Sequence, residues 1–165
     1  MLVSKALGLT DAQIRAALKQ VVLTDMRMQL IPVGDVLFIN DAYNAAPTSM
    51  HAAIQFVNQS TIRTDKWLVL GDMLELGNDE QQMHEEIAAH IDAKKVNYVC
   101  LYGPRMKWLF DKLQPQFAPG HVVYSETDYA PIVETIKQYA TNDTLILVKG
   151  SRGMKLETII ENVSK

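Results

Sequence analysis

The amino-acid sequence predicts an α/β protein, an open, mostly parallel sheet of about six strands with helices on both faces. Two observations carry this prediction. Five short apolar runs, rich in β-branched and aromatic residues, do not alternate with polar residues, which is typical of strands covered on both faces. The segments between these runs repeat apolar residues at the three- and four-residue spacing of a helix that packs by one side. This alternation favours right-handed crossovers between parallel strands.

The predicted elements follow one another in a regular order. The five strands lie at residues 36–39, 67–70, 98–102, 122–124 and 145–148. Apolar stripes mark the helices between and after them: Met50, Ala53, Ile54 and Val57; Met83, Ile87 and Ile91; Met106, Leu109, Phe110 and Leu113; Ile132, Ile136 and Tyr139; Leu156, Ile159, Ile160 and Val163.

Residues that favour helix ends stand at several of the expected boundaries. Residues 47–49 offer hydroxyl caps before the first of these helices. Residues 78–80 offer a cap and negative charge before the second, and Lys94 and Lys95 supply positive charge at its expected end. We therefore expect the second helix to extend from residue 80 to this lysine pair.

The N-terminal part of the chain has a different pattern. Residues 9–22 have a helical period, with Thr10 or Asp11 as N-cap, and no strand accompanies them. We interpret residues 1–22 as a remnant of a preceding domain and residues 23–165 as the α/β domain. Residues 26–33 are expected to add an edge strand, because Pro32 cannot donate to a strand ladder.

Composition excludes several classes of protein. The chain has 165 residues, with 16 basic and 19 acidic side chains and a net charge of −3, which does not favour a nucleic-acid-binding surface. Its one cysteine, Cys100, allows neither an intrachain disulfide nor a cysteine-based zinc site. No apolar run approaches the roughly 18 residues of a membrane span, and no leader peptide is recognisable. We expect a cytoplasmic protein without a membrane span.

Polar loops follow each of the five predicted strands. They cover residues 40–47, 71–77, 103–105, 125–128 and 149–153. Because ligands bind at the carboxyl ends of strands in open parallel sheets, these loops are expected to share one ligand-binding edge.

The chemistry of these loops suggests a ligand that carries phosphate or carboxylate. Lys149 and Arg152 flank glycines before a predicted helix and could form an anion site, although both could equally be solvated charges. Asp41 and Asp72 could accept hydrogen bonds from a ribose or an ammonium group or lie near a metal, and Asp72 could also be a helix cap. Asn44 can both donate and accept.

Other candidate residues favour structural interpretations. His84 is interpreted as a packing or capping histidine rather than a base, and Cys100 as a buried small apolar residue. The sequence contains no G-x-x-x-x-G-K-[ST] phosphate loop, G-x-G-x-x-G, G-x-S-x-G or H-E-x-x-H motif. The residues alone therefore predict an α/β domain with a ligand-binding edge, and no particular reaction.

Three segments together resemble a known family. They are residues 41–50 (Asp-Ala-Tyr-Asn-Ala-Ala-Pro-Thr-Ser-Met), residues 70–77 (Leu-Gly-Asp-Met-Leu-Glu-Leu-Gly) followed by His84, and residues 148–155 (Val-Lys-Gly-Ser-Arg-Gly-Met-Lys). In this order and spacing they resemble the Rossmann-like C-terminal domain of the Mur ligases, from about residue 24 to the end of the chain. Residues 1–22 resemble the last helix of the family's central ATPase domain. Ala46 stands where the family usually has the second asparagine of Asn-Ala-Asn-Pro.

The resemblance implies an ATP-dependent amide ligase of peptidoglycan precursor synthesis. Within the family it is strongest to the branch that adds D-alanyl-D-alanine to UDP-N-acetylmuramoyl-tripeptide through an acyl phosphate. This chain would be a lid that closes over the site. The phosphate loop and the Mg²⁺ ligands would belong to the central domain, so the partners of this chain are the N-terminal and central domains of the same polypeptide. We expect the chain alone to be inactive.

The resemblance also implies roles for individual residues. Arg27, Asp41 and Asn44 match nucleotide-binding positions, and Asn44, Lys149, Ser151 and Arg152 match substrate-binding positions. No residue of this chain is expected to be catalytic or to bind a metal.

Three alternatives remain open at this point. One is the corresponding domain of a folate-polyglutamylating or cyanophycin-type ligase, against which the residues 43–44 and 71–77 argue. Another is a stand-alone binding or scaffold module of the same fold. The last is a flavodoxin- or receiver-like module. A phosphoacceptor site of that kind needs paired acidic residues after the first strand, which this sequence lacks.

Overall fold

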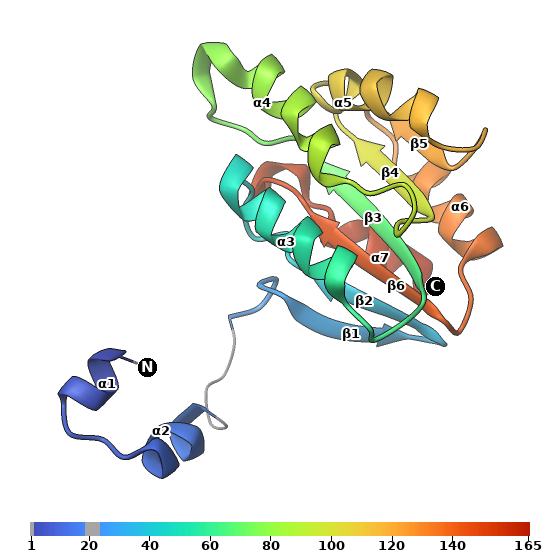
Figure 1. The fold of residues 1–165 in the computed structure, drawn as a ribbon. Helices are drawn as coiled ribbons and strands as arrows, with labels where there is room; N and C mark the ends of the chain where they lie inside the picture. The colour runs from blue at the N-terminus through green and yellow to red at the C-terminus, as the bar shows by residue number, and fades with distance from the viewer. Residues whose placement is uncertain (1, 19–23) are drawn as a thin grey trace.

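The structure is a computed structural model that describes residues 2–18 and 24–165, and a six-stranded sheet lies at its centre (Figure 1). The strands are β1 (Gln29–Val33), β2 (Val36–Asn40), β3 (Asp65–Gly71), β4 (Tyr98–Tyr102), β5 (Val122–Ser125) and β6 (Thr144–Lys149). Their order across the sheet is β1-β2-β6-β3-β4-β5. Only β1 and β2 pair antiparallel, and the other neighbours pair in parallel. The predicted open, mostly parallel sheet is confirmed.

The expected edge strand is β1, and it is shorter than the sequence predicts. It pairs with β2 from Gln29 opposite Asn40 to Val33 opposite Val36. Met26 and Met28 have φ angles of 59° and 51°. This left-handed backbone is incompatible with an extended strand, so β1 begins at Gln29 rather than at Met26.

Helices cover both faces of the sheet, as predicted. They are α3 (Pro47–Gln59), α4 (Glu80–Glu86), α5 (Met106–Leu113), α6 (Ala130–Tyr139) and α7 (Glu157–Val163). The apolar residues of α3 and α5 pack with Leu68 and Leu70 of β3 on one face. Those of α6 and α7 pack with Trp67 and Val69 on the other. The side chains of one strand therefore enter two cores, which is why the strand sequences read as continuous apolar runs.

The second of the predicted helices ends earlier than expected. α4 ends at Glu86 and continues only as a 3₁₀ turn over Ile87–His90. The backbone then becomes extended at Ile91, and the Asn58 side chain donates to the carbonyl of His90. Lys94 and Lys95 lie beyond this end, and Lys95 pairs with Asp92. The expected start is confirmed, since α4 begins at Glu80 with Asp79 at the N-cap position, although the Asp79 side chain makes no capping bond. The expected end at Lys94 and Lys95 is wrong.

The N-terminal region contains α1 (Leu2–Ala6) and α2 (Asp11–Leu18). Thr10 is the N-cap of α2, because its hydroxyl oxygen accepts from the backbone N–H of Gln13 at 3.3 Å. The expected helix end at residue 22 and the expected domain boundary between residues 22 and 23 lie outside the described residues. Within residues 2–18 and 24–165, no helix has the length and apolar character needed to cross a membrane.

Candidate functional site

The carboxyl ends of the parallel strands meet at one edge of the sheet. The register pairs Asn40 of β2 with Val148 of β6, Lys149 of β6 with Leu70 of β3, and Gly71 of β3 with Tyr102 of β4. The loops after these strands therefore start side by side, as the sequence predicts. Asp41 and Lys149, which are 108 residues apart in the chain, are in direct contact.

The first of two neighbouring hollows at this edge, which we call the Asp41 hollow, has a volume of about 370 Å³. It is lined by Arg27, Asp41, Tyr43, Asn44, Ala46, Ser49 and Lys149. All three residues that the family resemblance assigns to the nucleotide line it. The structure thus brings them together from two segments of the sequence, one before β1 and one after β2.

A buried ion pair forms one wall of the Asp41 hollow. The Nζ of Lys149 lies 2.6 Å from an Asp41 carboxylate oxygen and 3.0 Å from the carbonyl oxygen of Asn44. The side chains of Lys149 and Asp41 are only 3% and 15% exposed. The other Asp41 oxygen accepts from the backbone N–H of Met28 at 3.1 Å. Lys149 therefore fixes the loop after β2, and it lies with Arg27, Asp41 and Asn44 rather than with the predicted substrate residues Ser151 and Arg152.

Arg27 presents an exposed cation at the same hollow. Its guanidinium carbon lies 4.4 Å from the centre of the Tyr43 ring, which is a cation–π contact. Because a ring face offers no hydrogen-bond acceptor in the guanidinium plane, this contact orients Arg27 and leaves its N–H groups able to meet a ligand.

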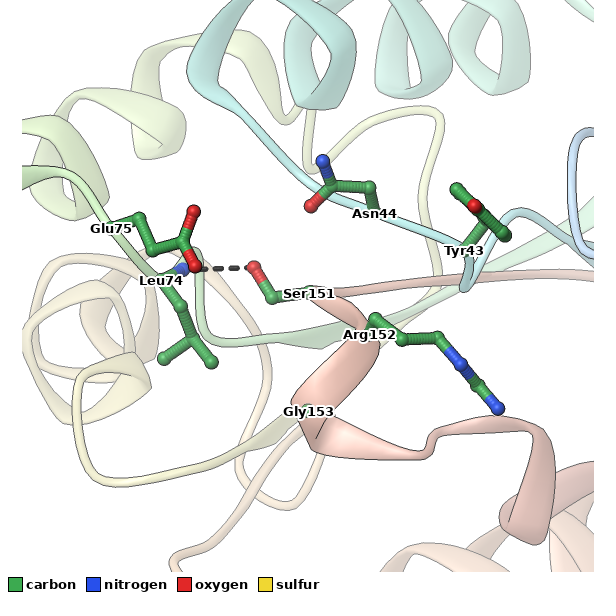
Figure 2. A pocket seen from close by; sticks show the side chains of 7 residues that line it. All are labelled: Tyr43, Asn44, Leu74, Glu75, Ser151, Arg152 and Gly153. Carbon is green, nitrogen blue, oxygen red and sulfur yellow. Dashed lines mark hydrogen bonds between the residues drawn. The ribbon is translucent and has the colours of Figure 1, made fainter.

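The second hollow, the Ser151 hollow, has a volume of about 380 Å³ and is drawn in Figure 2. Tyr43, Asn44, Leu74, Glu75, Ser151, Arg152 and Gly153 line it. Tyr43 and Asn44 also line the Asp41 hollow, so the two hollows are adjacent. Three of the four predicted substrate residues, Asn44, Ser151 and Arg152, lie here.

Ser151 joins two of the loops that form the hollow. Its hydroxyl oxygen accepts from the backbone N–H of Leu74 at 2.8 Å (Figure 2). Its own backbone N–H donates to the carbonyl of Asp72 at 3.0 Å. Ser151 is buried, so these two hydrogen bonds link the loops after β3 and β6 at this point.

The expected anion site of two cations at a helix start is not formed as predicted. Lys149 is paired with Asp41, and Arg152 pairs with Glu157 at 2.5 Å. Figure 2 shows the Arg152 side chain extending away from Ser151. Residues Arg152–Met154 form only a 3₁₀ turn, and α7 begins at Glu157. A three-residue turn has too few aligned peptide groups for the dipole of a full helix.

Asp72 is a cap rather than a ligand-facing carboxylate. It is buried, and it accepts from the backbone N–H groups of Arg105 at 3.3 Å and Met106 at 3.0 Å, at the start of α5. Burial raises the pKa of Asp72, and these backbone hydrogen bonds oppose the rise. The capping interpretation from the sequence is therefore confirmed.

His84 is the buried packing histidine that the sequence indicates. Burial is the main cause that lowers the pKa of its ring. Its contacts with the loop after β3 could not be predicted from the sequence. The sequence feature that draws attention to His84 is its position seven residues after Gly77, the last residue of the 70–77 motif.

The described residues contain no metal centre of their own. Across residues 2–18 and 24–165, no group of three or more histidine, cysteine, aspartate or glutamate side chains could hold a metal ion. Cys100 is buried, and burial raises the pKa of its thiol to about 12, so it is not a nucleophile at neutral pH.

Known proteins resemble this chain in both sequence and fold. The family model "Mur ligase, glutamate ligase domain" matches residues 26–152. A UDP-N-acetylmuramoyl-tripeptide–D-alanyl-D-alanine ligase of Bacillus subtilis (strain 168) is 38% identical over 157 residues, covering 94% of this chain and 34% of that protein. The ligase of the same name from Rickettsia prowazekii (strain Madrid E) is 33% identical over 152 residues, covering 92% and 33%.

A solved structure shows the same fold. The MurF ligase from Thermotoga maritima in complex with ADP has a TM-score of 0.79 and 21% identity, covering 99% of this chain and 35% of that chain. This chain therefore spans about a third of the length of the relatives it matches. Because the family model matches more than half of its residues, the chain belongs to the Mur ligase family.

Proposed function

We propose that this chain is the C-terminal, lid-forming domain of an ATP-dependent ligase that adds D-alanyl-D-alanine to UDP-N-acetylmuramoyl-tripeptide. The observation that supports this most is the adjacency of the two hollows, which share Tyr43 and Asn44. One contains the residues expected to contact a nucleotide, and the other contains most of those expected to contact a substrate. The sequence similarity to the Bacillus subtilis ligase supports the choice of substrates.

The proposed reaction needs two substrates held close together. ATP phosphorylates the terminal carboxylate of the tripeptide, the amine of D-alanyl-D-alanine attacks the acyl phosphate, and the tetrahedral intermediate loses phosphate. Arg27 supplies positive charge beside the nucleotide, and Asp41, held by Lys149, accepts hydrogen bonds from it. Ser151 lies at the substrate side. The contribution of this chain is positioning and charge neutralisation.

Other parts of the reaction are assigned to the rest of a longer polypeptide. The described residues do not fit a metal site, so we assign Mg²⁺ and the phosphate loop to a preceding ATPase domain. Residues 1–22 would be the end of that domain and residues 23–165 the lid. The cytoplasm is the expected compartment for this reaction.

A chimeric ligase tests the proposal. The matching third of the Bacillus subtilis ligase is replaced by this chain, and phosphate release is measured with ATP, the tripeptide precursor and D-alanyl-D-alanine. We expect release that depends on D-alanyl-D-alanine in the chimera, and none from the chain alone. Arg27→Ala in the chimera should raise the KM for ATP by about tenfold. The control variant Lys94→Ala, an exposed cation that lines neither hollow, should not.

Two outcomes would contradict the proposal. One is a chimera that is folded, as shown by cooperative unfolding, but releases no phosphate. If this inactive chimera still binds the ligands, the result would favour a stand-alone binding module. The other is phosphate release by the isolated chain.

A further inference from the structure

A group of buried and partly exposed polar side chains lies next to the loops of the Ser151 hollow without lining it. It consists of Asp72, Glu80, His84 and Arg105. The Nε of Arg105 lies 2.5 Å from a Glu80 carboxylate oxygen, and its Nη1 lies 3.5 Å from an Asp72 oxygen. His84 and Asp72 are buried. None of the roles proposed above uses this group.

Both ring nitrogens of His84 are occupied, and their partners fix the tautomer. Nδ1 lies 2.6 Å from the carbonyl oxygen of Glu80. A carbonyl can only accept, so Nδ1 carries the hydrogen. Nε2 accepts from the backbone N–H of Met73 at 3.0 Å. The ring is therefore neutral, and burial, which lowers its pKa, favours this form.

His84 and Ser151 accept hydrogen bonds from two consecutive residues of the chain. Met73 donates to His84, and the following residue, Leu74, donates to the Ser151 hydroxyl (Figure 2). Glu75 comes next with a φ of 63°, a strained conformation for a residue with a side chain. An external acceptor at Met73 helps to hold this turn in one conformation.

The bond from Leu74 also determines what Ser151 can do. Because the hydroxyl oxygen accepts the Leu74 N–H, the hydroxyl hydrogen is free to donate to an oxygen in the hollow. The Arg152 side chain, which lines the same hollow, extends away from Ser151 (Figure 2). The direction of the Ser151 hydroxyl thus depends on the position of the 73–75 turn.

We propose that His84 is a positioning residue of the ligase site: its neutral ring accepts the Met73 N–H and thereby fixes the turn that aims the Ser151 hydroxyl at an anionic oxygen of the substrate. The role of Ser151 toward substrate rests on the proposed function, whereas the contact between His84 and the turn does not. His84 is not a general base, because both ring nitrogens are occupied and the ring lines neither hollow.

The charged groups that face the ring come from three elements. Asp72 follows β3, Glu80 starts α4, and Arg105 precedes α5. The Trp108 ring of α5 contacts His84 edge-on, with ring centres 5.9 Å apart. Protonation of the His84 ring would place a second positive charge beside that of Arg105. It would also remove the lone pair on Nε2 that accepts the Met73 N–H.

The first test uses the 165-residue chain and needs no ligase activity. Nitrogen-15 NMR of the ring should show a hydrogen on Nδ1 and none on Nε2 at neutral pH. His84→Phe keeps a ring but removes the acceptor, so amide exchange at Met73 and Leu74 should become about tenfold faster. His84→Gln supplies an oxygen near the position of Nε2 and should retain most of the protection. His121→Phe, at the amino ends of the strands, is the matched control and should leave both amides unchanged.

Each outcome of this test decides the proposal. A hydrogen on Nε2, or equal exchange at Met73 and Leu74 in the unaltered chain and His84→Phe, would overturn it. If His84→Phe does not fold, the ring spectrum of the unaltered chain and the exchange rates of His84→Gln still decide.

The second test uses the active chimera and concerns the link to substrate. His84→Phe should raise the KM for the tripeptide precursor by about tenfold or more with the KM for ATP unchanged, and His84→Gln should restore it. Equal changes in both KM values would overturn the link to Ser151. An inactive parent chimera would instead contradict the proposed function, and the NMR result would still stand.

Discussion

The two hollows at the carboxyl-end edge are held by different physical means. Behind the Asp41 hollow, one buried ion pair between Asp41 and Lys149 joins the ends of β2 and β6. Behind the Ser151 hollow, a neutral histidine and a buried carboxylate accept backbone N–H groups from Met73 and Met106. The first wall depends on opposite charges, and the second depends on acceptors placed for particular backbone groups.

This difference predicts how each wall fails. Removing one member of a buried ion pair leaves the other charge unpaired, which costs much of the stability of a domain. Removing one acceptor leaves a backbone N–H unsatisfied, which costs less but changes the local geometry. The ion pair of the Asp41 hollow should therefore contribute more to the stability of the fold. The acceptors behind the Ser151 hollow should contribute more to the exact position of the residues that line it.

Lys149→Met should have the largest effect. It leaves the Asp41 carboxylate buried and unpaired, so the free energy of unfolding should fall by about 3–5 kcal/mol. Urea denaturation measures this change. Arg152→Met is the control, since Arg152 is 52% exposed in its pair with Glu157, and it should cost about 0–1 kcal/mol. Equal losses in the two variants would show that burial of the Lys149 pair does not matter.

Gly103→Ala should have the next largest effect, and it acts on the second wall. Gly103 has a φ of 113°, and a Cβ there would lie 2.5 Å from an Asp72 carboxylate oxygen. We expect a loss of about 2–4 kcal/mol, from backbone strain and displacement of the buried cap. Gly120 has a φ of 85° with open space around it, so Gly120→Ala should cost only about 1 kcal/mol. Thermal unfolding of both variants separates the clash from the strain, and indistinguishable transitions would argue against the Asp72 contact.

Ala46→Asn should stabilise the chain slightly. Ala46 is the N-cap of α3, with extended φ and ψ of −137° and 158° and no side-chain oxygen. An asparagine there can accept a hydrogen bond from the first turn of α3, so we expect a gain of about 1 kcal/mol in the free energy of unfolding. The substitution also places an amide side chain in the Asp41 hollow. A loss of stability in urea denaturation would mean that the cap geometry differs from this description.

Lowering the pH from 7 to 5 should have the smallest effect, and we expect it to act through the His84 ring behind the Ser151 hollow. His84 is neutral when folded, with a pKa lowered from the ordinary value of 6.5. Its contribution to stability is therefore complete above pH 6.5 and is lost as the pH falls through the lowered value, because the unfolded chain takes up the proton more readily. Asp72 acts in the opposite direction, since its pKa is raised from 3.8.

The comparison that isolates His84 is between the unaltered chain and His84→Gln. The unaltered chain should lose stability relative to His84→Gln as the pH falls below 6.5, because glutamine does not titrate. A difference that stays constant from pH 7 to pH 5 would contradict the neutral, buried ring.

The fold was largely predictable because its determinants are local. Strand β3 contributes side chains to both hydrophobic cores, through Trp67 and Val69 on one face and Leu68 and Leu70 on the other. Because both faces of the strand are buried, its sequence is a continuous apolar run. The ligand-binding edge was predictable for a related reason, since parallel strands bring their carboxyl ends together.

The partners of individual charges were not predictable. Lys149 finds Asp41 across 108 residues, and Arg105 finds Glu80 across 25, which depends on tertiary packing. A local signal also failed for α4, where Lys94 and Lys95 indicate a helix end but the chain leaves the helix before them. Whether Arg27, Asp41, Asn44, Lys149, Ser151 and Arg152 contact ligands stays a prediction.

Hydrogen exchange on the chimeric ligase tests most directly whether this edge is the ligand-binding face. The chimera is compared with and without the tripeptide precursor, D-alanyl-D-alanine and a non-hydrolysable ATP analogue. We predict slower exchange at residues 40–46, 71–77 and 149–154, and no change at residues 58–66 and 94–97 on the opposite edge of the sheet. Slower exchange confined to residues 58–66 and 94–97 would contradict the account.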